Sequence, residues 1–412
     1  MRKMSIIFII MSLHMFALSV ESQGNESKAS LSQKDVKADD GSGKMPAFSW
    51  DKVPLYLHIR KNEAFTSGEL KLIAKYPLVT FEKTTGMKTF GGSEKGTLSA
   101  AQSVKALNPN IKILYYWNVF IYWANFYEEQ DNIKSIKNAF LKNSKDGSKK
   151  IVRGRLPAYD LTKKTVRDWW VNHCKEMTEH SAIDGLFFDA NIKVLYDRYA
   201  KGALGKKKKE KLVEAYKIMM NDARGAVDEN KLVVANIIRA LLPASGLEYM
   251  NYFDGSYIEG FFPNAPSPTY EEYVIKGMDA VIKAAQSGKI IAFSPGFKRA
   301  LTSKNAKGNI TLDDVDRRAK SKKEELYKMR MSLAIFLICA EKYSYFNCHA
   351  YSAEEKPLDD RWYPEYDKPL GAPKGPAVKN GYVYTREFKY ASVWVDIKNQ
   401  KSRITWHGEQ TK

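Results

Sequence analysis

Two acidic residues in this chain each follow a short apolar run, at positions where a buried strand would end. Asp189 follows the run IDGLFF, and Glu259 follows the run GSYI. Cleavage of a glycosidic bond needs two carboxyl groups, one to protonate the leaving oxygen and one to attack the anomeric carbon or activate water. We therefore predict that Asp189 and Glu259 are a catalytic pair. As alternatives, Asp189 could cap the next helix and Glu259 could be a solvated loop residue.

Other polar and aromatic residues lie at the ends of apolar runs or just after them, and we predict that they contact the substrate. They are His58, Arg60, Glu82, Trp117, Asn118, Asn191, Asn236, Arg239, Ser294, Asn347 and His349. The set shows no Ser-His-Asp arrangement and no evident cluster of metal ligands, so we expect neither a metal nor a cofactor. His58 could equally be a hydrogen-bonded core histidine, and the aromatic residues could serve packing. Asp184 lies at the start of its run and Asp254 directly precedes its run, which predicts structural roles at the opposite end of the strands.

The elements that position these residues alternate along the chain. Eight short runs are rich in β-branched or aromatic residues, as buried parallel strands are. They cover residues 54–59, 78–81, 111–117, 183–188, 232–238, 255–258, 290–293 and 343–347. Apolar residues at helical spacing cover residues 165–180, 209–229, 270–286 and 322–342.

This alternation predicts an α/β fold, an eight-stranded (β/α)8 TIM barrel. The main alternative is an open, doubly wound sheet. Eight runs, and the lack of a glycine-rich phosphate loop after the first of them, favour the barrel. The strands of a barrel end at one common mouth, so the residues that follow the runs should gather there. The long, aromatic connection at 118–182 suits an insertion that shapes the substrate site.

The chain divides into four predicted parts. Residues 1–19 have a basic start, an apolar stretch and small residues, which predicts a signal peptide and a secreted or periplasmic protein. An uncleaved membrane anchor is the alternative. Residues 20–46 are rich in Ser, Lys, Asp and Gly, which predicts a flexible linker. Residues 47–350 form the predicted barrel, and 351–412 a small C-terminal β unit packed on it, with strands at 382–386, 391–397 and 403–406.

The chain is strongly basic, with a formal net charge of +19. Removal of residues 1–19 would delete Arg2 and Lys3 and leave a charge of +17. An acidic glycan is one partner that this charge would suit, whereas a lysine-rich solvated surface is the plain alternative. We expect no nucleic-acid partner and no stable membrane insertion after signal removal. The three cysteines have no zinc-ligand spacing, and a bridge between Cys339 and Cys348 stays open.

Three segments resemble the hypothetical glycosyl-hydrolase-like family fifteen. They are DGLFFD, which ends at Asp189, YIEGF around Glu259, and the tail PLGAPKGPAVKNGYVYTREFKYASVWVDIKN. The resemblance spans roughly residues 50–400 and implies a TIM barrel and a secreted glycan hydrolase of no particular substrate. Carboxyl groups on the fourth and sixth strands are similar to the α-galactosidase arrangement, which implies Asp189 as nucleophile and Glu259 as acid/base. The tail departs from the family pattern at residues 389–392 and at Asp396.

Together these features predict a secreted glycoside hydrolase that acts on an oligosaccharide or polysaccharide. One alternative is a noncatalytic glycan-binding barrel. It would place Asp189 and Glu259 more than about 10 Å apart, outside both geometries of glycoside hydrolysis. The other alternative is a different carbohydrate-active enzyme on the same fold, a lyase or a deacetylase.

Overall fold

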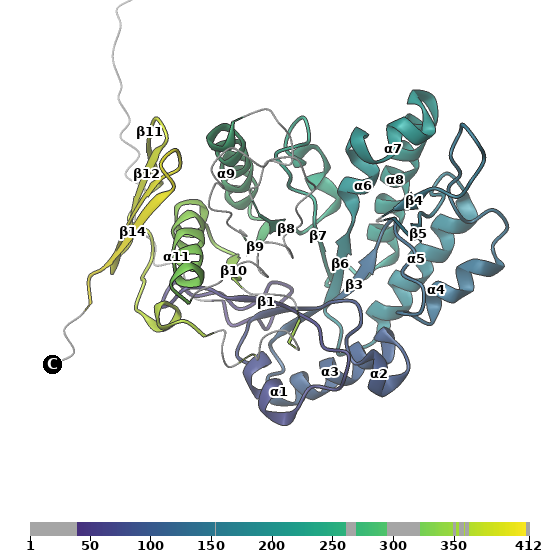
Figure 1. The fold of residues 1–412 in the computed structure, drawn as a ribbon. Helices are drawn as coiled ribbons and strands as arrows, with labels where there is room; N and C mark the ends of the chain where they lie inside the picture. Colours follow the sequence, from purple (N-terminus) through teal and green to yellow (C-terminus); the bar gives the residue numbers. More distant parts are fainter. Residues whose placement is uncertain are drawn as a thin grey trace, which may run out of the picture. The chain divides into compact units, whose positions relative to one another are not determined.

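The computed structural model describes residues 39–152, 154–260, 269–294, 322–348, 352–353, 358 and 362–408. The predictions for the signal peptide at 1–19 and for His349 lie outside these residues. Strands and helices alternate along the chain, and a second sheet lies near the C-terminus (Figure 1).

Eight parallel strands form the main sheet, in the order β1-β2-β3-β6-β7-β8-β9-β10. They are β1 (Tyr56–Ile59), β2 (Leu78–Phe81), β3 (Lys112–Asn118), β6 (Gly185–Asp189), β7 (Leu232–Ala235), β8 (Gly255–Glu259), β9 (Ile290–Ser294) and β10 (Ser344–Phe346). Parallel bridges from Leu55 to Phe346 and from Arg60 to Ser352 join the first strand to the last. The sheet is therefore a nearly closed barrel, which confirms the predicted fold and shows that the open doubly wound alternative was wrong.

Helices connect the strands. The longer ones are α1 (Ser67–Ile73), α3 (Ser93–Leu107), α5 (Lys164–Glu179), α7 (Asp197–Leu204), α8 (Lys206–Ala226), α9 (Tyr270–Gln286) and α11 (Lys322–Cys339). Shorter turns are α2 (Met87–Phe90), α4 (Glu129–Asn132), η1 (Ile133–Ser135), α6 (Asn191–Leu195), η2 (Leu247–Tyr252) and η4 (Pro364–Asp367). Thr269 and Glu272 form a capping box at the start of α9, which is why that helix begins where its sequence predicts.

Side chains alternate between the two sides of strand β3, and this alternation decides which of them reach the barrel interior. Tyr116 points inward and donates a hydrogen bond to Asp189 on β6. Its neighbour Trp117 points outward and packs on His173 and Trp169 of helix α5, with ring centroids 4.3 and 5.8 Å away. Aromatic residues on this strand therefore serve two different surfaces.

Strands β6 and β8 begin with the same dipeptide, Asp-Gly. A Cβ atom on Gly185 would lie 2.1 Å from the carbonyl oxygen of Leu232, and one on Gly255 would lie 2.4 Å from that of Ile290. Only glycine permits such a close approach of the neighbouring strand. The dipeptides therefore permit close strand pairing at the end of the barrel where the strands begin, which we call its lower end.

A second, antiparallel sheet follows the barrel in the chain. It consists of β11 (Val378–Asn380), β12 (Val383–Glu387), β13 (Ala391–Asp396) and β14 (Lys401–Trp406), and the last three strands contact α11. The buried Arg386 donates hydrogen bonds to the carbonyls of Leu337 and Ile338 near the end of α11 and pairs with Glu341. The predicted C-terminal sheet is thus present, although the short strand β11 was not predicted.

The predicted flexible linker, residues 20–46, is wrong for its last part. Asp39 pairs with Phe48 through two backbone hydrogen bonds, and Lys44 forms an ion pair with Asp254 at 2.9 Å. Tyr343 also donates a hydrogen bond to Asp39 at 2.7 Å. Residues 39–46 bury few apolar side chains, but their polar groups bind the lower end of the barrel, which composition alone does not indicate.

Two other sequence features can be compared with the described residues. Among the described helices, none combines the length and the hydropathy needed to cross a bilayer. Cys174 and Cys339 are buried free thiols, and Cys348 is a partly exposed free thiol, so the open bridge between Cys339 and Cys348 is not formed.

Candidate active site

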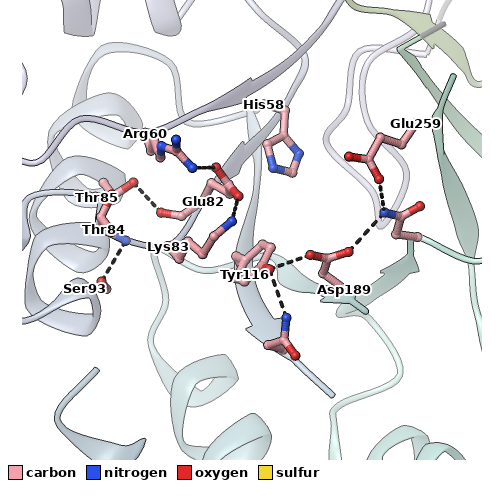
Figure 2. A network of polar contacts seen from close by, with 12 residues as sticks. His58, Arg60, Glu82, Lys83, Thr84, Thr85, Ser93, Tyr116, Asp189 and Glu259 are labelled. Atoms are coloured by element: carbon pink, nitrogen blue, oxygen red, sulfur yellow. Dashed lines mark hydrogen bonds and ion pairs between the residues drawn. The ribbon is translucent and has the colours of Figure 1, made fainter. Parts of the chain in front are cut away.

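Asp189 and Glu259 face each other at the mouth of the barrel (Figure 2). They end β6 and β8, which are separated by β7, and Asn236 follows β7 directly. The amide nitrogen Nδ2 of Asn236 donates to Oδ1 of Asp189 and to Oε2 of Glu259, at 3.0 Å each. Because both oxygens bind the same nitrogen, they are at most about 6 Å apart. The fold therefore gathers the two predicted carboxylates.

The surroundings of Asp189 favour its ionised form. Partial burial acts to raise the pKa of this carboxyl, and the Lys83 ammonium acts to lower it. Hydrogen bonds from the Tyr116 hydroxyl at 2.6 Å, from the Asn236 amide and from the Ala190 backbone N–H lower it further. The pKa of Asp189 consequently lies below its usual value, so the group is an anion at neutral pH.

Ala190, the residue after Asp189, has an unusual backbone. Its φ angle is +68°, in the left-handed region that residues with a Cβ atom seldom adopt. Such conformations occur preferentially at functional sites, where the surrounding structure supports the strain. Here the conformation accompanies the Ala190 N–H that stabilises the Asp189 carboxylate.

Glu259 has a different environment, dominated by a cation. Nη2 of Arg239 lies 2.6 Å from Oε2 of Glu259, the same oxygen that accepts from Asn236. The other terminal nitrogen of Arg239, Nη1, and the amide oxygen of Asn236 are buried without a hydrogen-bond partner. Buried polar groups are rarely left unpaired, so these two atoms represent unused hydrogen-bonding capacity beside Glu259.

A second charged cluster lies beside the pair. Glu82, buried after β2, contacts the ammonium of Lys83 and lies 3.0 Å from Arg60. Burial acts to raise the pKa of Glu82, but Lys83, Arg60 and then His58 bring it below the usual value. The ammonium of Lys83 also lies over the rings of Tyr116 and Trp123, 4.9 and 5.1 Å from their centroids. Glu82 thus compensates the positive charges of Lys83 and Arg60, and Lys83 interacts electrostatically with both Glu82 and Asp189.

His58 belongs to the aromatic interior below the mouth. Its Nδ1 pairs with the Tyr56 hydroxyl at 2.9 Å, and its ring packs on Phe187 and Tyr257. Burial is the main reason that the pKa of His58 falls to about 4, so the ring is neutral at neutral pH. This placement matches the core-histidine alternative better than a direct contact with substrate.

Other predicted contact residues are not brought to the pair. Trp117 lies on the outer side of β3, as described above. Asn118 accepts hydrogen bonds from the backbone of the following turn and donates one to the Tyr116 hydroxyl. Asn191 donates to the Phe188 carbonyl and accepts from the Tyr216 hydroxyl of α8. These two amides are fully buried and hold the strand ends in place.

Ser294 and Asn347 do lie near the pair in the sheet. Ser294 is in register with Glu259, and the Asn347 backbone binds the carbonyl of Phe293, the residue before Ser294. Both side-chain polar atoms of Asn347 are buried without a partner. The row of residues at the mouth therefore continues across β9 and β10 with unsatisfied hydrogen-bonding capacity.

Two residues at the site, Tyr116 and Lys83, were missed from the sequence. Tyr116 could have been found by counting back two residues from Asn118, because alternate residues of a strand share one face. Lys83 lies one position beyond the predicted Glu82 and carried no signal of its own. Asp184 and Asp254 are, as predicted, structural: they accept backbone hydrogen bonds from Ile113 and Val233, both at 2.8 Å.

The chain was then compared with known proteins. The model of hypothetical glycosyl hydrolase family 15 matches residues 105–392, which include both Asp189 and Glu259. The chain belongs to this family. Membership makes it a carbohydrate-active enzyme of the glycoside hydrolase class, as the sequence predicted. The match begins after β2, so it leaves out His58, Arg60 and Glu82. No curated protein matches the chain.

Solved structures of glycoside hydrolases are similar to it at low identity. The glycoside hydrolase domain of PelA from Pseudomonas aeruginosa is 10% identical, with 57% of this chain and 81% of that chain covered and a TM-score of 0.40. The debranching enzyme of Nostoc punctiforme is 10% identical, with 85% and 88% covered and a TM-score of 0.44. A GH36 α-galactosidase variant of AgaA from Geobacillus stearothermophilus is 8% identical, with 83% and 47% covered and a TM-score of 0.45. Likenesses at this level carry no argument about substrate or mechanism.

Proposed function

We propose that this protein cleaves a glycosidic bond with retention of anomeric configuration, using Asp189 as nucleophile and Glu259 as general acid/base. The observation that carries the proposal is the shared hydrogen bond from Asn236, which limits the facing oxygens to about 6 Å. Retaining enzymes hold their carboxyl groups about 5–5.5 Å apart, and inverting enzymes hold them about 6.5–9.5 Å apart to admit a water molecule. The separation supports the retaining geometry and speaks against the noncatalytic alternative.

The environment of Asp189 supports its role as nucleophile, and the position of Glu259 across the mouth supports its role as acid/base. Asp189, held as an anion, attacks the anomeric carbon, and the leaving oxygen takes a proton from Glu259. The resulting glycosyl ester is hydrolysed when the Glu259 carboxylate removes a proton from the attacking water and Asp189 leaves. Oε2 of Glu259 accepts from Arg239 and from Asn236, so both donors hold this carboxyl group in position for the two proton transfers.

The substrate in this proposal is an oligosaccharide or polysaccharide met outside the cytoplasm, which rests on the signal-peptide-like start of the sequence. An acidic glycan is suggested by the net charge of +19. In the described mouth, however, three basic side chains (Arg60, Lys83, Arg239) face three carboxylates (Glu82, Asp189, Glu259). Any preference for an acidic polymer would therefore come from other surfaces. Binding to anionic polysaccharide that weakens with salt, beside weak binding to neutral polymers, would support it.

The proposal is tested by digestion of a panel of neutral and acidic polysaccharides, with detection of new reducing ends. The wild-type chain should release reducing ends from at least one polymer, and the Asp189→Asn variant should release none above background. Release of unsaturated ends or of acetate would instead support the lyase or deacetylase alternative. Equal release by both proteins would remove Asp189 from the mechanism.

Once a substrate is found, proton NMR of the first product separates the two stereochemical routes. We expect the anomer of the substrate to form first and to mutarotate afterwards. Initial formation of the opposite anomer would overturn the retaining assignment and require a water molecule between the two carboxylates.

A further inference from the structure

A second group of potential ligands lies on the outer side of the barrel, between α5 and the short helix α4 of the 118–163 segment. Nδ1 of His173 and carboxylate oxygens of Glu129 and Glu176 lie within 4.8 Å of one another. The three residues line an open cavity of about 450 Å³. Strand β3 separates this cavity from the catalytic pair, since Trp117 packs on His173 while Tyr116 binds Asp189.

Local structure explains how these residues come together. His173 and Glu176 are three positions apart on α5, a spacing that places them on one face of a helix. Glu129 comes from α4, which Figure 1 shows beside α5. The indole nitrogen of Trp169 donates to Glu129 at 2.5 Å, so the carboxylate is already held over the same face of α5.

The imidazole of His173 is the feature that points to a ligand. The side chain is 3% exposed, and its Nδ1 has no hydrogen-bond partner. The oxygen of Glu176 lies 3.6 Å from Nδ1, beyond hydrogen-bonding distance. A buried nitrogen left in this state destabilises the fold unless a further group satisfies it.

The rest of the ring is arranged as it is in a metal ligand. Nε2 pairs with the Tyr115 hydroxyl at 3.0 Å, so the tautomer with the proton on Nε2 donates to Tyr115 and directs the Nδ1 lone pair toward the carboxylates. Histidine ligands of metals usually have their second nitrogen held in this way.

We propose that Glu129, His173 and Glu176 bind a divalent transition-metal ion such as Zn²⁺, which fastens the 118–163 segment to helix α5. One imidazole and two carboxylates are a donor set that zinc accepts, with water completing the coordination. Two ligands of one zinc ion lie at most about 4.2 Å apart, so the group must contract slightly. The exposed side chain of Glu176 provides that movement.

The role of the ion is structural. The segment that it fastens also supplies Trp123, whose ring lies under the ammonium of Lys83 at the mouth. The metal would therefore stabilise one wall of the substrate site without touching the reacting atoms. This inference is independent of the proposed hydrolytic mechanism, because its ligands lie on the other side of β3.

The test uses the full chain after treatment with a chelator, titrated with Zn²⁺ by calorimetry and followed by thermal unfolding. We expect one ion per chain and a higher melting temperature with Zn²⁺. The Glu176→Gln variant should weaken the affinity at least tenfold. Glu179→Gln is the matched control, because Glu179 is exposed on the same helix but lies outside the group. It should bind Zn²⁺ like the wild type.

His173→Gln supplies a second test if it folds, and it should abolish binding. X-ray absorption of the zinc-loaded chain should show one imidazole among oxygen ligands. Equal affinity in wild type and Glu176→Gln, or no stoichiometric binding by the wild type, would overturn the proposal.

Discussion

Strands β6 and β8 carry acidic residues at both ends, and the two ends use them differently. At the lower end, Asp184 and Asp254 each accept a backbone N–H of a neighbouring strand and pair with a basic side chain. At the upper end, Asp189 and Glu259 accept from side-chain donors and share one of them, and Asp189 also accepts from the N–H of Ala190, the residue that follows it. The same strands thus hold one structural pair and the pair that we propose to be catalytic.

The difference lies in what each carboxylate binds. A backbone N–H in a parallel sheet cannot move without breaking the strand pairing, so the lower pair is fixed. Side chains such as Tyr116, Asn236 and Arg239 can exchange their hydrogen bonds for those of a substrate. A carboxylate at a strand end is therefore a candidate for chemistry when its partners are side chains. It is a candidate for a structural role when its partners include the backbone of the next strand.

The largest effect on activity, with little effect on stability, is expected when the charge of Asp189 or Glu259 is removed. Asp189→Asn and Glu259→Gln should each lower kcat by at least about a hundredfold, because general acid/base or nucleophilic catalysis is lost. Melting temperatures should change little, since neither residue is needed for strand pairing. Steady-state kinetics beside thermal unfolding measures both effects. Turnover like that of the wild type in either variant would exclude that residue from the mechanism.

Removal of Asp184 or Asp254 should lower the stability of the protein and leave its activity unchanged. Asp184→Ala leaves the backbone N–H of Ile113 unpaired and Lys105 without its carboxylate. We expect a loss of about 1–3 kcal/mol in the free energy of unfolding, measured with denaturant. Activity per folded molecule should be retained, and Asp254→Ala should behave alike. A loss of kcat comparable to that of Glu259→Gln would contradict the division between the two ends.

A smaller effect on activity is expected from substitution of Tyr116, whose hydroxyl donates a hydrogen bond to Asp189. Tyr116→Phe removes one donor that lowers the pKa of Asp189, so this pKa should rise. The proposed nucleophile, Asp189, is active as the anion, and this form is lost as the pH falls through its pKa. The acidic limb of kcat/KM should therefore move to higher pH. Tyr115→Phe is the matched control, because that hydroxyl lies on the other side of β3. An equal shift in both variants would contradict the assignment.

Much of the fold followed from local pattern. The eight runs became the eight barrel strands because short apolar segments of this composition have few other ways to be buried. Helix α9 has the predicted bounds because its capping box marks its start. The hairpin of β4 (Ile151–Val152) and β5 (Leu156–Pro157) was not predicted, since two-residue strands leave no periodic signal.

The site was less predictable than the fold. Selecting the residues at the ends of predicted strands found Asp189, Glu259, Asn236 and Arg239, which form one hydrogen-bonded network. This selection also included Trp117, whose side chain lies on the outer face of β3 because it alternates with the inward Tyr116. A shift of one residue in a strand moves every side chain to the other face.

The sequence by itself determined that acidic side chains stand at both ends of two barrel strands, since that follows from the order of apolar and polar residues along the chain. Only the tertiary structure decided that Asn236 donates hydrogen bonds to both Asp189 and Glu259. It also decided that Arg239 pairs with Glu259 and that the charge of Lys83 lowers the pKa of Asp189. The physical reason is that separations between side chains on different strands depend on how the barrel closes and how its strands are staggered. No short stretch of sequence contains that information.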